Sequence, residues 1–410
     1  MNLIGVMNQN LDVGETGNMN DFIKNVIFKK NDINLIIQTT AGCNLRCKHC
    51  YEANGHYDSS IMSVNTLREI LLKFSSNYNR ISICWFGGEP LLAGRIFFEN
   101  IIKLENECNK LNGTIFRNSI QTNGILLDDE LLKLLKDNGF RISFSYDCHF
   151  NNILRQKTEK TLTAIKKCNE QNLHVGIISM IFKNNYKMDD QISMINECKK
   201  LGISFKFNRI FSEGAAKNND TFLIPNKEYF EEFKKMFLYW LYNDTYIPFE
   251  NMNIIINSLY DVSGRECTYN GCMFKWFAID PNGNLYSCPR FINSEWSFGN
   301  ISDYNNPKEI FVSKGYLDMV KQVNIRLLTC KKHCKLYKYC KGGCNAQSYY
   351  TNDLKNSDTD LCKFTKEIFP FVALTIYNCI NNDKINPYCK YLVKNYQEKI
   401  IEVYKEIYEA

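Results

Sequence analysis

Three cysteines on one short stretch constrain this chain of 410 residues more than any other feature. They are Cys43, Cys47 and Cys50, separated by three residues and then by two. Three thiolates at this spacing can hold three irons of a four-iron cluster and leave the fourth iron open for a small cofactor. The alternative is a structural zinc ion, which needs four ligands in a closed tetrahedron, and the nearest fourth candidate is His49. The spacing therefore favours a cluster with one open iron.

A second group of eight cysteines lies in the C-terminal part of the chain: Cys267, Cys272, Cys288, Cys330, Cys334, Cys340, Cys344 and Cys362. The chain begins without the basic and apolar regions of a signal peptide, so we expect a cytoplasmic protein. In that reducing compartment, clustered cysteines are metal ligands more often than disulfides. No run of 18 apolar residues predicts a membrane span. Lys and Arg exceed Asp and Glu by six, and their spread along the chain weighs against a nucleic-acid surface.

Short β-branched or apolar runs alternate with longer helical patterns through residues 34–222. The runs predict strands over 35–38, 81–85, 114–120, 141–145, 175–180 and 204–208. Helical spacing predicts helices over 64–75, 94–111, 128–137, 158–171 and 188–201. Six strand-helix units in succession imply a parallel sheet that curls into a partial barrel. Reactive groups gather at the C-terminal ends of such strands, and the Cys43 loop follows the first of them.

The rest of the chain has a different pattern. Residues 223–266 predict a helical connection with a helix over 227–242, and residues 267–370 are rich in Cys, Gly and Asn, with few long periodic segments. Metal clusters would have to organise that region. Residues 371–410 form a predicted helical tail with a surface helix over 394–409, and residues 1–33 are an N-terminal extension. The predicted fold class is α/β, a partial (β/α)6 barrel of parallel strands followed by a Cys-rich domain with little regular structure and a C-terminal helix.

Cys43, Cys47 and Cys50 resemble the CxxxCxxC loop of radical S-adenosylmethionine enzymes. The segment 87–90 follows the second predicted strand and looks like the family's GGEP segment, which contacts the methionine amino group of the cofactor. The resemblance implies an enzyme in which the open iron binds S-adenosylmethionine, whose cleavage gives a 5'-deoxyadenosyl radical that abstracts a hydrogen atom. A side chain at Gly88 is then expected to intrude on the cofactor without loss of iron. The cofactor-binding residues implied in this way are Gly87, Gly88, Glu89, Pro90, Ser145 and Arg155.

Two further segments resemble this family. Cys148 stands after the fourth predicted strand, where the family usually has a glycine. Asn208 and Arg209, with Gly214, look like the family's NR...EG turn at the end of the sixth strand, which implies a position facing substrate or cofactor. The sequence assigns no catalytic acid or base.

The second cysteine group resembles the SPASM extension of peptide- and protein-modifying members, with Gly283 between Cys272 and Cys288. The resemblance implies two fully ligated auxiliary four-iron clusters. The first would use Cys267, Cys272, Cys288 and Cys344, and the second would use Cys330, Cys334, Cys340 and Cys362. A zinc knuckle over 330–344 is the alternative for the closing cysteines.

Members with this extension mainly modify ribosomally made peptides by a thioether or carbon-carbon crosslink. A second group forms formylglycine in sulfatases and uses an aspartate directly after the third cysteine of the first auxiliary set. This chain has Pro289 and then Arg290 there, and neither is a general base near neutral pH. The resemblance therefore predicts a crosslinking peptide maturase. The alternatives are an anaerobic sulfatase-maturating enzyme and, in another class, a non-catalytic iron-sulfur electron-transfer or scaffold protein.

The expected partners follow from this function. They are a precursor peptide and a reductant such as flavodoxin or ferredoxin, with no nucleic acid and no membrane. Only about 33 residues precede the first predicted strand, too few for an independent leader-binding domain, so a separate leader-binding protein is a further candidate.

Overall fold

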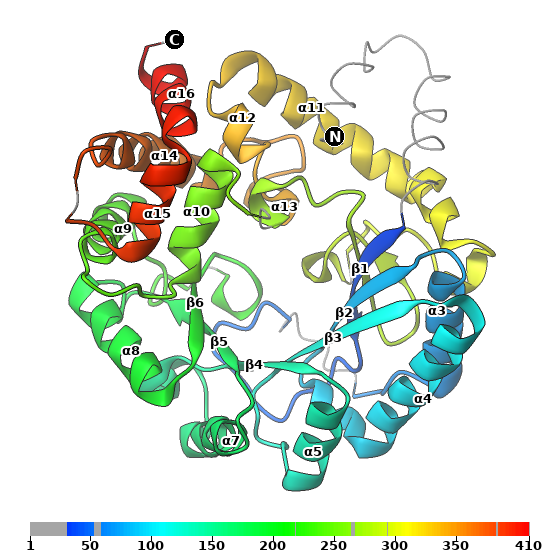
Figure 1. The fold of residues 1–410 in the computed structure, drawn as a ribbon. Helices are drawn as coiled ribbons and strands as arrows, with labels where there is room; N and C mark the ends of the chain where they lie inside the picture. The colour runs from blue at the N-terminus through cyan, green and yellow to red at the C-terminus, as the bar shows by residue number, and fades with distance from the viewer. Residues whose placement is uncertain are drawn as a thin grey trace. The chain divides into compact units, whose positions relative to one another are not determined.

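The computed structural model describes residues 31–52, 59–217, 219–263, 267–292, 294–382 and 384–409. They form two compact units, each treated by itself below. Figure 1 labels the helices and strands of the chain. The first unit contains the described residues up to 146 together with 151–176 and 272–321, and the second contains 147–150, 177–271 and the residues from 322 onward. The predicted extension over 1–33 lies almost entirely outside the described residues. The domain boundaries expected from the sequence stay predictions.

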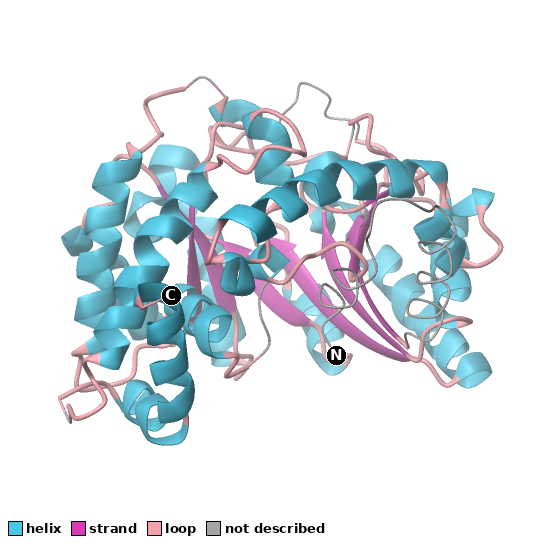
Figure 2. Cartoon of the chain, turned by 90° about the horizontal axis from the view of Figure 1, so that it is seen from above, coloured by secondary structure: helices cyan, strands magenta, loops and turns pink. Residues whose placement is uncertain are grey.

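The first unit is built on a sheet with the strand order β4-β3-β2-β1-β7-β8. Its strands are β1 (Asp32–Gln38), β2 (Arg80–Phe86), β3 (Ile115–Thr122), β4 (Arg141–Ser145), β7 (Trp276–Ile279) and β8 (Leu285–Tyr286). Neighbours from β4 to β7 are parallel, and β7 and β8 are antiparallel. Alternate residues such as Leu35, Ile37 and Ile83 are buried, as strand periodicity requires. Figure 2 shows these strands in magenta among cyan helices. The four strands predicted in this part of the chain are confirmed.

The register brings the carboxyl ends of neighbouring strands to one edge. Gln38 of β1 is opposite Phe86 of β2, and Thr122 of β3 is opposite Phe144 of β4. The loops that follow these strands therefore leave the sheet side by side. The Cys43 loop, the segment 87–90 and the end of β3 share this edge.

The helices of this unit begin where polar side chains cap them. Ser63 accepts a hydrogen bond from the Thr66 amide at the start of α3 (Val64–Ser75), and Asp128 accepts one from the Leu131 amide at the start of α5 (Asp129–Asp137). Helix α4 (Gly94–Asn112) ends at Gly113, which has the left-handed conformation favoured after a helix. The short α6 (Asn151–Leu154) and α7 (Thr158–Glu170) follow β4. The helices predicted from periodicity in this unit agree with these bounds to within one residue.

The Cys-rich region adds an edge to the sheet that the sequence analysis did not predict. Strand β7 pairs in parallel with β1, and its Phe277, Ala278 and Ile279 are fully buried. The hairpin thus covers an edge of β1 that would otherwise be open to other strands. Gly283 turns the hairpin with φ of +87°, and a Cβ there would lie 3.0 Å from the Ile301 side chain. These strands are too short for period-two alternation to reveal.

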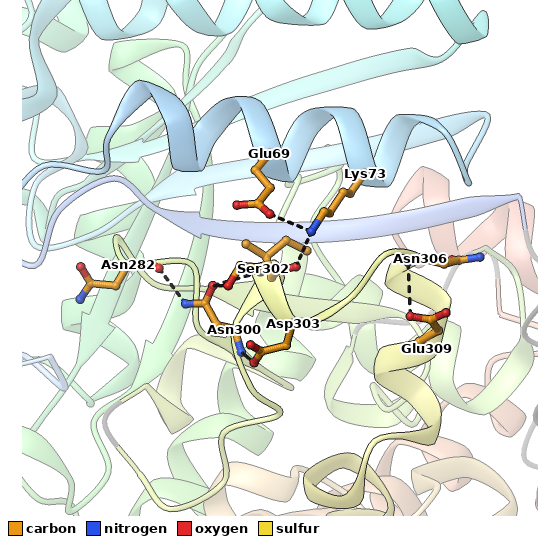
Figure 3. Close-up of polar contacts among 9 residues, drawn as sticks. Glu69, Lys73, Asn282, Asn300, Ser302, Asp303, Asn306 and Glu309 are labelled. Atoms are coloured by element: carbon orange, nitrogen blue, oxygen red, sulfur yellow. Dashed lines mark hydrogen bonds and ion pairs between the residues drawn. The ribbon is translucent and has the colours of Figure 1, made fainter.

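The segment after the hairpin is fastened to α3. The Lys73 ammonium donates to the Ile301 carbonyl at 3.0 Å (Figure 3). Asn300 and Asp303 form a capping box around the short turn at 301–303, and a second box closes the turn at 307–312. The chain after Cys288 is therefore held by side-chain hydrogen bonds in place of a long regular element.

The second unit carries the last two predicted strands, β5 (Gly176–Ile181) and β6 (Ser204–Arg209), which are neighbours. Helix α8 (Met188–Leu201) joins them, and α9 (Asn226–Leu241) and α10 (Glu250–Tyr260) follow. The other helices are α11 (Lys314–His333), which contains the boundary between the units, α12 (Tyr337–Cys340), α13 (Asn345–Thr351), α14 (Asp360–Tyr377), α15 (Pro387–Asn395) and α16 (Gln397–Tyr408). The fold class is confirmed as α/β with parallel strands.

Two details of the C-terminal part differ from the expectation. The tail predicted as one helix over 394–409 is two helices, because Tyr396 leaves the helical conformation with φ of −128°. The region expected to have few long helices contains the 20 residues of α11. Its buried stripe includes Tyr316, Met319 and Val323, but the next buried position is Arg326, which is 0% exposed. A charged residue inside the stripe hides the helical period in the sequence.

Cys148 has a left-handed backbone, with φ of +52°. This explains why a glycine is usual there, since only glycine adopts this conformation without steric cost. The Cys148 sulfur is buried and lies 3.7 Å from the sulfur of Cys198.

We expect Cys148→Gly to be more stable than Cys148→Ala by about 1 kcal/mol, because both variants lose the thiol and only alanine keeps the backbone strain. Urea unfolding of both variants measures the difference. An alanine variant as stable as the glycine variant would show that the backbone at position 148 is not strained.

Candidate active site

Hydrogen bonds to backbone carbonyls fix the path of the Cys43 loop where it leaves β1. The Thr39 amide donates to the Phe86 carbonyl at 2.9 Å, so the loop begins in register with the end of β2. The Arg46 guanidinium then folds back to the Cys43 carbonyl at 2.6 Å, and the Cys50 amide donates to the Cys47 carbonyl at 3.3 Å. These contacts close the three-cysteine stretch into a compact turn.

The thiols in this turn act on one another. Burial is the main cause that raises the pKa of Cys50 to about 12. The Glu52 carboxylate and the neighbouring Cys47 and Cys43 act in the same direction, and the Glu52 backbone N–H, which donates to the sulfur, opposes them. Burial also raises the pKa of Cys43, whose sulfur accepts the Leu45 amide at 3.4 Å. A positively charged iron core would hold such thiols as thiolates, and N–H groups directed at sulfur suit cluster ligands. The residues present therefore fit a cluster.

Single-ion sites need ligand atoms that converge on one point. In the part of the chain that the structure describes, no three His, Cys, Asp or Glu side chains converge in this way. The thiolates of a four-iron cluster bind different irons and need no common point. The zinc alternatives therefore receive no support from the geometry.

The two glycines of the GGEP-like segment pass directly against the Cys43 loop. The Gly88 amide donates to the Thr40 carbonyl at 2.9 Å, and the Glu89 amide donates to the Gly42 carbonyl at 2.8 Å. A Cβ on Gly87 would lie 2.2 Å from the Thr40 carbonyl oxygen, and one on Gly88 would lie 2.2 Å from the Gly42 oxygen. Glycine is required here because another backbone occupies the space of a side chain. The segment supports the cysteine loop as well as any cofactor beside it.

Glu89 joins the ends of two strands through its buried carboxylate. One oxygen accepts from the Thr122 hydroxyl at 2.6 Å and from the Leu91 amide at 3.0 Å, and the other accepts from the Asn123 amide at 2.8 Å. Burial raises the pKa of Glu89 to about 7, although these hydrogen bonds favour the ionised form. The side chain thus positions the end of β2 against the end of β3.

Sequence reasoning missed the residues at the end of β3. The Asn123 side chain donates to the Asn44 side chain in the cysteine loop at 2.7 Å, and its carbonyl accepts from Thr161 of α7 at 2.8 Å. Asn123 therefore links the cysteine loop to the sheet and to a helix. The signal was present as the polar run from Gln121 to Asn123 at the carboxyl end of a predicted parallel strand.

Ser145 and Arg155 lie at the same edge as the loop. Gln121 donates to the Ser145 hydroxyl at 2.9 Å, which joins the ends of β3 and β4. The Lys48 amide of the cysteine loop donates to the Leu154 carbonyl at 2.9 Å, directly before Arg155. The structure thus places Ser145 beside the end of β3 and Arg155 next to a residue that contacts the cysteine loop, and the contact of both with a cofactor stays a prediction.

Arg209, at the end of β6 in the second unit, is held by protein groups. Its guanidinium donates to the Asn226 side chain at 2.7 Å and to the Ile224 carbonyl, and it lies 4.8 Å from the centre of the Tyr229 ring. These contacts indicate a supporting role for this end of the NR...EG-like turn.

The second unit gathers the four cysteines predicted for the second auxiliary cluster. Cys330 and Cys334 are one helical turn apart at the end of α11, Cys340 ends α12, and Cys362 lies in the first turn of α14. The Thr359 hydroxyl caps that turn by accepting the Cys362 amide at 3.0 Å. Burial raises the pKa of Cys340 to about 12, with further contributions from Cys330, Cys362 and Cys334. Four thiols that influence one another fit one fully ligated cluster.

The four cysteines predicted for the first auxiliary cluster are divided between the units. Cys272 and Cys288 flank the hairpin of β7 and β8 in the first unit, and Cys267 and Cys344 belong to the second. Their assignment to one cluster stays a prediction.

Arg326 is a buried cation beside the second cysteine set. It donates to the Leu354 carbonyl at 3.1 Å and to the Asn345 side chain, and it opposes the burial that raises the pKa of Cys330. Asn345 directly follows Cys344. Arg326 thus ties α11 to the segment that carries another predicted ligand.

We expect Arg326→Met to lower the free energy of unfolding by about 2 to 4 kcal/mol, because two buried acceptors lose a charged donor. The matched change at the exposed Arg68, which pairs with Glu107, should cost less than about 1 kcal/mol. Urea unfolding and iron analysis compare the two variants. Equal losses would show that Arg326 has no special role.

Comparisons with known proteins agree with this geometry. Residues 37–205 match the Radical SAM superfamily. The chain is 26% identical over 373 residues to a cysteine-type anaerobic sulfatase-maturating enzyme of Clostridium perfringens. The aligned region covers 85% of this chain and 98% of that enzyme. The solved structure of native anSMEcpe with bound AdoMet has a TM-score of 0.74 and 24% identity, covering 85% of this chain and all of the other. Streptococcus suis SuiB bound to S-adenosylmethionine has a TM-score of 0.61 and 15% identity, covering 88% and 86%.

Residues 37–205 therefore match a radical SAM domain, which indicates a radical SAM enzyme acting on a peptide or protein. S-adenosylmethionine and four-iron clusters are the cofactors of such an enzyme. Its fold is that of the sulfatase maturases and of SuiB. None of the described helices is long and apolar enough to cross a membrane.

Proposed function

We propose that this enzyme modifies a ribosomally made peptide in the cytoplasm and joins two of its residues through a thioether or carbon-carbon bond. A peptide substrate is supported by the similar proteins, since SuiB has been solved with its precursor peptide SuiA and anSMEcpe with the Kp18Cys peptide. The S-adenosylmethionine cleaved at the open cluster supplies the radical that abstracts a hydrogen atom from the peptide. A reductant such as flavodoxin or ferredoxin supplies the electrons.

The residues of the first unit have distinct roles in this proposal. Cys43, Cys47 and Cys50 hold the open cluster. The backbone of Gly87 and Gly88 lets β2 pass beneath the cysteine loop, and it forms one wall of the S-adenosylmethionine site. Ser145 and Arg155 are further residues that would contact S-adenosylmethionine.

The observation that carries the choice of reaction is the segment after Cys288. Pro289 opens a short turn there and has no titratable group, and the buried Phe291 closes it. Arg290 and Cys288 both lie within electrostatic range of Tyr51, the residue after Cys50. A cation therefore stands near the radical loop, and it stays protonated at neutral pH. It can bind a carboxylate of the peptide, but it cannot remove a proton from a substrate thiol or hydroxyl.

Formylglycine formation is the second candidate. The similarity to sulfatase maturases over 85% of the chain favours it. It would need a base other than residue 289 or 290.

A mass measurement tests the choice between the two reactions. The reconstituted enzyme is incubated with reductant, S-adenosylmethionine and either a cysteine-rich peptide encoded beside its gene or a sulfatase-motif peptide. We expect the first peptide to lose two hydrogens per link, with one cysteine blocked to alkylation if the link is a thioether. A carbonyl on the sulfatase peptide, with no change in the other, would select the second candidate.

A further inference from the structure

One segment of this protein carries a dense excess of positive charge. Residues 326–366 contain nine Lys and Arg and three Asp, an excess of six, which is the excess of the whole chain. The remainder contains 41 basic and 41 acidic residues. The lysines of this segment form no continuous run, because cysteines and aromatic residues are interleaved with them.

The lysines of this segment surround the second cysteine set. Five lysines and no acid lie between Cys330 and the end of the stretch at Lys341. The exposed lysines of this segment are Lys331, Lys332, Lys335, Lys338, Lys355, Lys363 and Lys366. Lys331 directly follows Cys330, and Lys363 directly follows Cys362. Exposed lysines therefore stand next to two of the predicted cluster ligands.

Helix α16 covers one flank of this lysine cluster. Lys338 forms ion pairs with Glu402, at 3.0 Å, and with Glu406, and Lys335 donates to the Ile407 carbonyl. Acids of the same chain thus neutralise Lys338. Lys363 has one long pair with Asp358 at 3.6 Å, in which both side chains are about half exposed or more. Such exposed, weakly paired charges give the surface a positive potential that acts at a distance.

A redox cluster beneath a lysine-rich surface suits a particular kind of partner. Cleavage of S-adenosylmethionine consumes one electron, and closing the crosslink from the substrate radical releases one electron and one proton, so an outside carrier must supply the first electron and any electron lost in uncoupled cleavage. Electron-transfer complexes are small, polar and held mainly by charge, and complementary charge raises their rate of association. We propose that the lysines of residues 331–366 form the docking surface of an acidic one-electron carrier protein, which delivers electrons through the second cysteine set. This inference rests on the proposed function.

A charge-reversal experiment tests the docking surface. The test variant carries Lys332→Glu, Lys355→Glu and Lys363→Glu, which avoid the residues tied to α16. The control carries Lys160→Glu, Lys200→Glu and Lys227→Glu, three exposed positions outside the segment, with the same change of net charge. Both are compared with the wild type by fluorescence anisotropy of labelled flavodoxin at low ionic strength. Iron content and the rate of S-adenosylmethionine cleavage with a small-molecule reductant are measured in parallel.

We expect the test variant to raise the Kd for flavodoxin about tenfold, and the control less than about twofold, because only the first loses charges at the docking surface. Iron content and cleavage with the small-molecule reductant should not change. Equal binding by both variants would overturn the proposal. So would weaker binding of the peptide substrate, or of nucleic acid, without an effect on flavodoxin. Because binding is read directly, a wild type that modifies no peptide would contradict the proposed function and leave this test intact.

Discussion

Replacing Cys43, Cys47 and Cys50 together by alanine should abolish S-adenosylmethionine cleavage and remove about a third of the iron. Three four-iron clusters hold about 12 irons per chain, and this turn holds one cluster of about 4. The closing cysteines, Cys330 among them, belong to the second unit and keep their own contacts. The loss of iron should therefore be confined to the open cluster. Iron analysis after anaerobic reconstitution and chromatography of 5'-deoxyadenosine measure both effects.

The matched control replaces three cysteines outside both groups. Cys84, Cys108 and Cys168 are suitable because they come from other parts of the first unit. Their variant should keep about 12 irons and its cleavage activity. Continued production of 5'-deoxyadenosine by the Cys43 triple variant would refute the assignment of the open cluster.

Gly88→Ala should lower S-adenosylmethionine cleavage about a hundredfold and also lower the iron content of the open cluster, because a displaced loop misplaces the reacting groups. The added Cβ would lie 2.2 Å from the Gly42 oxygen and 2.5 Å from the Ala41 oxygen, so the backbone directly before Cys43 must move. Activity assays and iron analysis of the purified variant measure the two losses.

Gly113→Ala is the control for this variant. A Cβ at Gly113 meets nothing within 4 Å, and φ of +69° adds only backbone strain of about 1 kcal/mol. The Gly113→Ala variant should unfold at a slightly lower urea concentration and keep its iron content and its cleavage activity. If Gly88→Ala keeps its iron and loses only affinity for S-adenosylmethionine, the segment contacts the cofactor without supporting the cysteine loop.

The sequence was most informative where a regular period or a motif carries the structure. The six strands from Asp32 to Arg209 and the helices between them follow from alternating and helical spacing, which burial on one face enforces. The edge that holds the Cys43 loop follows from parallel connections alone. The four cysteines predicted for the second auxiliary set lie within electrostatic range of one another, and their assignment to one cluster stays a prediction.

The rest depends on contacts between residues that are distant in the sequence. Nothing local shows that Glu89 reaches Thr122 and Asn123, or that Asn123 reaches Asn44. From sequence alone a side chain at Gly88 is expected to intrude on the cofactor and leave the iron in place. In the structure a Cβ on Gly88 would meet the Gly42 carbonyl oxygen, directly before Cys43. We therefore expect such a side chain to displace the cysteine loop and to cause loss of iron. The buried Arg326 interrupts the apolar pattern of α11, so the pattern did not predict this helix. The acceptor that pairs with its charge, the Leu354 carbonyl, lies far along the chain.

Deuterium transfer tests the central claim most directly. The claim is that a radical formed from S-adenosylmethionine takes hydrogen from a peptide carbon and that this carbon then joins another residue. The reconstituted enzyme is given a fully deuterated cysteine-rich peptide encoded beside its gene, and both products are weighed by mass spectrometry. The account predicts one deuterium in each 5'-deoxyadenosine coupled to turnover, together with an internally crosslinked peptide. Unlabelled 5'-deoxyadenosine, or a labelled product with a peptide that bears a carbonyl and no crosslink, would contradict it.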